Sequence, residues 1–171
     1  MSITQSADWS SCANPVHSIP LLTAYNPAQT DNYYSINPTD MEEQVLLYGY
    51  QSRGNAGGAF TSQVGATVPL HHLFYYSSAT GNDNFYTTNA TERDVFIAQK
   101  GYTDRGIAAY VYETQICGSV PLFRSFNPVV VDHFYTNNLT EDRLVSTTKN
   151  YVQEGIQCYV VPDPTDWFHK H

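Results

Sequence analysis

The residues of this chain that could bind a ligand recur in one short motif, an aspartate followed by an amide or imidazole and two aromatic residues. The motif occurs three times, as Asp31-Asn32-Tyr33-Tyr34, Asp83-Asn84-Phe85-Tyr86 and Asp132-His133-Phe134-Tyr135. An aspartate beside an amide or imidazole can fix sugar hydroxyl groups while an exposed tyrosine ring stacks on the sugar. The motif therefore indicates carbohydrate binding. In the structural alternative, the aspartates cap turns or bond to backbone, and the second aromatic residues form a core.

Alternation along a strand places residues 33, 85 and 134 on the opposite side from residues 34, 86 and 135. At most one residue of each pair can therefore line a site. The candidate ligand-binding residues are Asp31, Asn32, Tyr34, His72, Asp83, Asn84, Tyr86, Arg124, Asp132, His133, Tyr135 and Glu154.

A catalytic site is also conceivable, because Asp132-His133 together with Arg124 and Glu154 contains groups that exchange protons. The other two copies lack this full set, whereas a catalytic site usually occurs once and this motif is repeated. We therefore expect no enzyme activity and assign no catalytic residue.

A metal site is not expected either. A set made of Asp132, His133 and either His17 or His72 has no recognised ligand spacing. Cys158 falls at the end of a predicted strand, where small residues pack, and is a poor candidate nucleophile. We expect no metal and no cofactor.

Each motif lies in a longer repeat that has the same marker residues in the same order. A Pro-Leu pair precedes the motif, and a threonine, a Gly-Tyr or Asn-Tyr pair and a further glycine follow it. Repeats joined by short linkers must share one core. We predict one domain, 1–171, composed of an N-terminal arm (1–17), three repeats (18–63, 68–115 and 120–164) and a tail (165–171).

Every repeat is expected to hold three strands and one helix. In the first repeat, strands are predicted over Ile19–Tyr25 and Asn32–Ile36. The helix begins at Thr39, which forms a capping box with Glu42. Each helix ends where a residue tolerates the left-handed conformation, at Gly49, Gly101 or Asn150. The β-prone closing segments are Ala56–Thr61, Ile107–Tyr112 and Ile156–Val161.

These elements define a mainly β fold with three short helices. Three repeats of about 50 residues are expected to close on a pseudo-threefold axis, because closure removes exposed sheet edges. The preferred architecture is a small propeller-like ring. The alternative is a β-trefoil, which would have four strands and no helix in each unit.

Composition limits the partners of the chain. Sixteen acidic residues against eight Lys and Arg give a formal charge of −8, which argues against nucleic acid or an anionic membrane as partner. No apolar run is long enough for membrane insertion. The first residues have neither a basic nor an apolar segment, so we see no signal peptide and expect a cytoplasmic or unconventionally secreted protein.

The three cysteines, Cys12, Cys117 and Cys158, have no metal-ligand spacing. We interpret them as free thiols, with a Cys12–Cys117 disulfide as the alternative. Two glycosylation sequons, at Asn89 and Asn138, coincide with predicted helix starts, so we interpret both as structural.

Residues 18 to about 161 resemble a tandem repeat of unassigned function with the form YRLYNPNSGDHFYT–AAERDxLVxAGWxYEGIAWY. The resemblance includes Phe126-Asn127-Pro128, Asp132–Thr136 and Glu154-Gly155-Ile156, and in the second repeat Glu92-Arg93-Asp94. Such repeats accompany bacterial cell-wall hydrolases and surface proteins and occur in small fungal proteins. The resemblance implies a compact threefold module that holds an enzyme near a polysaccharide.

The functional hypothesis is a non-catalytic, lectin-like module with up to three related sites for a glycan or cell-wall polysaccharide. Repetition of weak sites would supply avidity. Because repeat 3 alone keeps the histidine, arginine and glutamate of the resembled family, we expect it to carry the strongest site. The alternatives are a protein-binding or defence protein, such as an inhibitor or toxin-like factor, and a cell-wall-targeting appendage.

Overall fold

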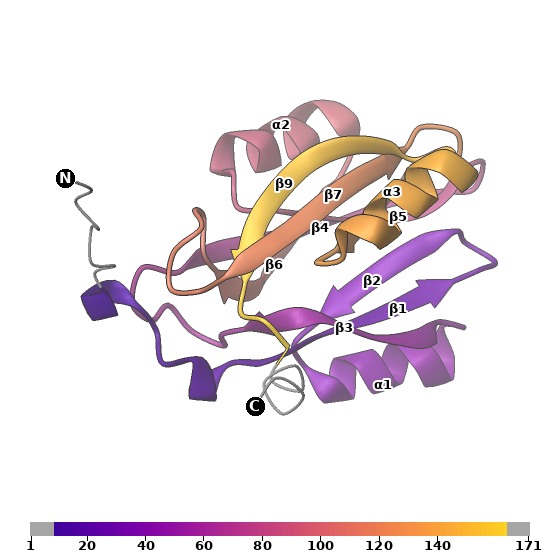
Figure 1. Cartoon of the computed structure of the whole chain (residues 1–171). Helices are drawn as coiled ribbons and strands as arrows, with labels where there is room; N and C mark the ends of the chain where they lie inside the picture. The colour runs from indigo at the N-terminus through magenta and orange to yellow at the C-terminus, as the bar shows by residue number, and fades with distance from the viewer. Residues whose placement is uncertain (1–8, 164–171) are drawn as a thin grey trace.

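The computed structural model of the chain describes residues 9–163 (Figure 1). The predicted tail, 165–171, and the first part of the predicted arm therefore lie outside the described residues. Two short 3-10 helices, Trp9–Ser11 and Pro15–His17, form the described part of the arm. Among the described residues, every helix is too short or too polar to cross a membrane.

Three antiparallel sheets follow, each with three strands in the same order and one helix. The strand that comes first in the sequence of each repeat is central in its sheet, and the second and third strands flank it. The first repeat contains β1 (Ile19–Asn26), β2 (Asp31–Ser35), α1 (Pro38–Leu47) and β3 (Gln51–Ala59). The second contains β4 (Val68–Ser77), β5 (Gly81–Thr87), α2 (Ala90–Lys100) and β6 (Thr103–Val111). The third contains β7 (Val120–Asn127), β8 (Asp132–Thr136), α3 (Leu139–Thr148) and β9 (Val152–Val160).

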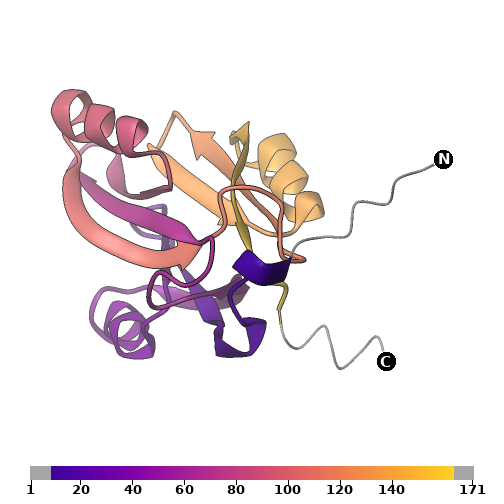
Figure 2. The same cartoon turned by 90° about the vertical axis from the view of Figure 1, so that its left-hand side faces the viewer.

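The prediction of a mainly β fold with three short helices is confirmed. The three helices lie on the outside, apart from one another, around the strands (Figure 2). The sheets are open, which is compatible with a trefoil-like arrangement, although each has three strands and an accompanying helix. The propeller-like closure is not confirmed.

Asparagines begin all three helices, which corrects the prediction that Thr39 caps α1. The Asn37 side chain accepts hydrogen bonds from the backbone N–H groups of Thr39 and Asp40. Pro38 occupies the first helical position, where its missing N–H costs nothing. The sequon residues Asn89 and Asn138 cap α2 and α3 in the same way, in line with their structural interpretation. The predicted left-handed ends are confirmed, with φ of +80° at Gly49, +76° at Gly101 and +62° at Asn150.

Isolated bridges between third strands join the repeats at one end. Phe60 pairs with Tyr110, Tyr112 with Tyr159, and Gly58 with Val161. The approach at the last bridge is so close that a Cβ on the neighbouring Gly57 would lie 2.7 Å from Val160. Each repeat thus makes backbone contact with both of the others.

The arm covers this end of the molecule. Ala13 is buried against Phe60, Tyr112 and Val161, and its N–H donates to the Tyr112 hydroxyl. A disulfide joins Cys12 to Cys117 across a sequence separation of 105. The free-thiol interpretation is therefore wrong for these two cysteines, because the arm folds back onto the linker between repeats 2 and 3. It is confirmed for Cys158, which is buried and free.

Candidate functional site

Tyr34, Tyr86 and Tyr135 meet at the centre of the three sheets. All three are at least 97% buried, and their rings contact one another edge to face with centroids 5.3–5.5 Å apart. The core interpretation of these tyrosines is therefore confirmed. Their rings are not available for stacking on a ligand.

The tyrosine hydroxyls close the free edges of the edge strands β2, β5 and β8. Tyr86 accepts a hydrogen bond from the Tyr34 N–H at 3.0 Å and donates one to the Tyr34 carbonyl at 2.9 Å. Tyr135 bonds the backbone of Tyr86 in the same way, and Tyr34 bonds that of Tyr135. The cycle satisfies six buried backbone groups that would otherwise lack partners.

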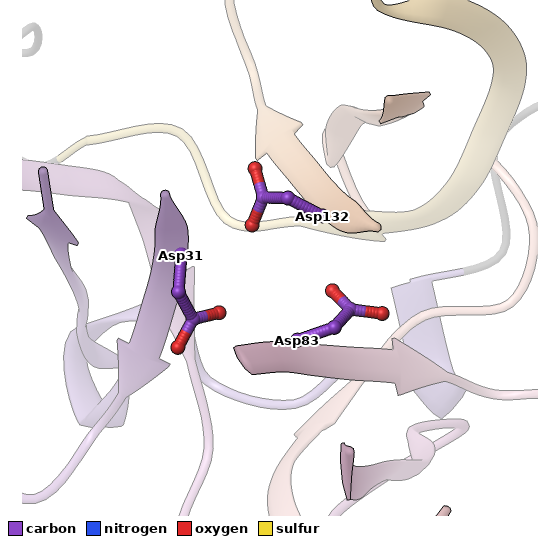
Figure 3. Close-up of side chains that lie close together, drawn as sticks. All are labelled: Asp31, Asp83 and Asp132. Atoms are coloured by element: carbon purple, nitrogen blue, oxygen red, sulfur yellow. The ribbon is translucent and has the colours of Figure 1, made fainter. Parts of the chain in front are cut away.

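The three motif aspartates form a second buried layer, and their carboxylates approach one another from three strands (Figure 3). Each binds the next repeat through that repeat's second motif residue. Asp31 accepts the backbone and side-chain N–H groups of Asn84, Asp83 those of His133, and Asp132 those of Asn32. Each also accepts a hydroxyl from its own repeat, namely Tyr50, Tyr102 or Tyr151.

Electrostatic repulsion and burial act on this aspartate layer. One carboxylate oxygen from each residue lies within 4.8 Å of the others. Burial raises the pKa of Asp31 to about 7, and burial followed by the charges of Asp83 and Asp31 raises the pKa of Asp132 well above its ordinary value. These are the residues that could hold a cation, but all six oxygens already accept hydrogen bonds from protein groups. The layer is fully explained as an interface between repeats.

The predicted third-repeat set also lies in an interface. Arg124 donates to Glu154 at 2.6 Å and to both oxygens of Glu92 in repeat 2, and its side chain is 13% exposed. His133 is 3% exposed. Its Nδ1 donates to Asp83 at 2.7 Å, and its Nε2 lies 3.8 Å from Glu154. The structure thus brings these predicted residues together, but as a bridge between repeats 2 and 3.

An open groove lies instead between repeats 1 and 2. This first groove has a volume of about 880 Å³ and is bordered by α1 on one side and by β4–β6 on the other. His72 and Asn84 lie in it, joined by a 2.7 Å hydrogen bond between Nε2 and Oδ1. Because the Asn84 amide nitrogen donates to Asp31, its oxygen must accept from His72. Burial lowers the pKa of His72, so its ring is neutral at pH 7.

Aromatic side chains line the rim of the first groove. Tyr48 and Tyr76 are 60% and 67% exposed. Phe74 lies beneath the guanidinium of Arg105, which is 5.0 Å from its ring centroid. Polar groups lie between these rings, and the buried Oδ1 of Asn82 has no hydrogen-bond partner among the described residues. Flat aromatic faces next to amides and carboxylates are the groups that sugars require.

The corresponding interfaces are more filled because one helix position differs. Seven residues after the capping asparagine stand Gln44 in α1, Phe96 in α2 and Val145 in α3. Phe96 stacks on Phe85 at 4.0 Å and packs near His133, so it occupies the space between repeats 2 and 3. A smaller second groove of about 290 Å³, which Val145 lines, remains between repeats 3 and 1.

A β-bulge aims one charged residue of each repeat toward these interfaces. Gly54 and Gly155 pair with Thr23 and Arg124, and the residue before each glycine is left out of the register. Those extra residues are Arg53 and Glu154, and Arg105 precedes Gly106 in β6. The glycines have φ near +90°, which explains why the repeat requires glycine there.

Sequence reasoning missed most residues of the first groove. No repeated motif includes Gln44, Tyr48, Tyr76 or Asn82. The predicted candidates in the lining are Tyr34, His72 and Asn84. The sequence signal that could have found the missed residues is a departure from the repeat. Gln44 and Tyr48 stand at positions where the other two helices carry different residues.

The arrangement defines a β-rich module built from three similar units, with grooves between them. The chain belongs to the family described as Domain of unknown function (DUF5648), which matches residues 20–161. Comparisons with curated proteins and with solved structures gave no match.

Proposed function

We propose that this chain is a non-catalytic carbohydrate-binding protein and that the first groove is its main site. The supporting observation is the combination of two exposed tyrosines, Tyr48 and Tyr76, with the His72–Asn84 pair and the unpaired Asn82 oxygen. Sugar rings would stack on the tyrosines, and their hydroxyls would bond to the polar groups. This proposal replaces the expectation that repeat 3 carries the strongest site, because Phe85 and Phe96 fill the space around Arg124 and His133.

Two wider proposals accompany this one. The cyclic contacts between repeats support a pseudo-threefold arrangement. The Cys12–Cys117 disulfide supports exposure to an oxidising environment, because such bonds persist mainly outside the cytosol. A role as a cell-wall-targeting appendage would use the same groove on a polymeric glycan.

One observation favours a protein partner as the alternative. Leu46 and Leu47 at the end of α1 are about 70% exposed and adjoin Tyr48. The other helices carry smaller or polar residues there, Ala98 and Gln99 in α2 and Thr147 and Thr148 in α3. An apolar edge beside a groove is typical of a protein-binding surface.

A glycan-array screen with soluble competitor tests the carbohydrate proposal. Competable binding that falls about tenfold in Tyr48→Ala and Tyr76→Ala would support it, since each loss removes one stacking face. Val129→Ala is the matched control, because Val129 is equally exposed and lies outside the first groove. A blank array, with capture of a protein that Leu46→Ser abolishes, would support the alternative and refute the carbohydrate proposal.

A further inference from the structure

The second groove differs from the first in its charge. It lies between repeats 3 and 1, and its lining includes Tyr25, Arg53, Phe134, Glu141 and Lys149. Two basic residues therefore line it, in a chain that has only eight Lys and Arg residues and a net charge of −8.

Neither cation is neutralised within the described part of the chain. Neither Arg53 nor Lys149 makes an ion pair among residues 9–163. The Arg53 guanidinium makes one 3.3 Å hydrogen bond, to Gln51, and lies 5.7 Å from the centroid of the Tyr25 ring. Glu141 accepts a hydrogen bond from Thr136 at 2.6 Å and pairs with neither cation. Most of the five donor hydrogens of Arg53 thus remain available.

The equivalent positions in the other interfaces lack this combination. Between repeats 2 and 3, the bulge residue is Glu154, and Lys100 lies on the Phe96 ring at 4.3 Å. In the first groove the bulge residue is Arg105, but the position that corresponds to Lys149 is occupied by Tyr48. The paired cations are therefore particular to the second groove and are no consequence of the repeat.

We propose that the second groove binds an oxyanion, a carboxylate or sulfate, carried on a polar ring such as an acidic sugar. Arg53 provides a planar fork that matches the two oxygens of a carboxylate or sulfate, and Lys149 provides a second positive charge. Tyr25 and Phe134 provide flat surfaces for the ring, and Asn32 and Asn127 also line the groove. This site does not depend on carbohydrate binding in the first groove.

Titrations of the full chain with glucuronate, glucose, sulfate and acetate at low ionic strength test the proposal, with chemical shifts followed by NMR. We expect glucuronate to bind most tightly, to shift groove residues such as Asn32, and to weaken as salt screens the charges. Arg53→Gln and Lys149→Gln should each lower its affinity about tenfold, and Glu141→Gln should raise it several-fold. Equal binding of glucuronate, sulfate and acetate would support a site for the free oxyanion and refute the contribution of the ring.

Arg143→Gln is the matched control, because it removes one charge from the exposed face of α3 outside the second groove. An equal loss of affinity in Arg143→Gln would show that net charge alone attracts the ligand and would overturn the proposal. Absence of any shift at Asn32 with all four probes would overturn it as well. Tyr48→Ala leaves the second groove intact, so its effect on array binding reports separately on the first groove.

Discussion

The hydroxyl of Tyr86 is expected to contribute strongly to stability although it is a single oxygen atom. In Tyr86→Phe the ring remains and can keep its contacts with Tyr34 and Tyr135, so packing changes little. The Tyr34 N–H and carbonyl, however, lose the partner that lies 3.0 and 2.9 Å away. Both groups are buried too deeply for water to replace it.

An unsatisfied buried polar group costs about 1–3 kcal/mol, so two groups that lose their common partner predict a decrease of about 2–6 kcal/mol in the free energy of unfolding. Against the 5–15 kcal/mol that is typical of domains, this decrease is a large fraction. Urea denaturation should show a lower midpoint with an unchanged slope.

The matched control is Tyr76→Phe, because Tyr76 is 67% exposed and belongs to no buried network. Its change should stay within about 0.5 kcal/mol. Tyr34→Phe and Tyr135→Phe should resemble Tyr86→Phe, since all three hydroxyls make the same pair of bonds. A change below about 0.5 kcal/mol in Tyr86→Phe would refute the reasoning that these hydroxyls close the strand edges.

Two further predictions concern pH and reduction. Because the folded pKa of Asp31 is about 7 and its ordinary value is 3.8, the folded chain holds a proton that the unfolded chain releases. The free energy of unfolding should therefore rise by about 1 kcal/mol as pH falls from 8 to 6.5, with Asp132 acting in the same direction. The lowered pKa of His72 opposes part of this gain as pH approaches 6.5, and more of it below; a stability that falls between pH 8 and 6.5 would contradict the assignment. Reduction of Cys12–Cys117 should lower the free energy of unfolding by about 5 kcal/mol, because the bond closes a loop with a sequence separation of 105; an unchanged urea midpoint after reduction would show that the arm contributes nothing.

The local structure was largely predictable from the sequence. The marker residues of the repeat located the helices within one or two residues. Gly49, Gly101 and Asn150 marked the helix ends, because helix termination depends on nearby backbone conformation. The third strands begin several residues earlier than predicted, at Gln51, Thr103 and Val152. Each starts before the glycine that the prediction treated as a boundary, since a β-bulge lets the strand continue through it.

The candidate site was harder to predict, because its arrangement depends on contacts between repeats. Alternation shows that Tyr33 and Tyr34 face opposite sides, but it does not show that both sides are buried, Tyr34 in the central core and Tyr33 against Met41 of α1. The repeat 1 partners of Asp132 and Tyr135, which are Asn32 and Tyr34, lie about 100 residues away along the chain. The disulfide was ambiguous for the same reason, because three cysteines permit three pairings and only the fold of the arm selects one.

The cyclic order of the contacts has a kinetic consequence for a chain made from one end. Repeats 1 and 2 can join as soon as β5 is available, through Asp31–Asn84 and Tyr86–Tyr34. The closing contacts, Asp132–Asn32 and Gly58–Val161, need β8 and the end of β9. Contacts so distant in sequence form slowly. During synthesis the contact sites of the first two repeats for repeat 3 therefore remain unpaired until the final residues of the third repeat complete the fold.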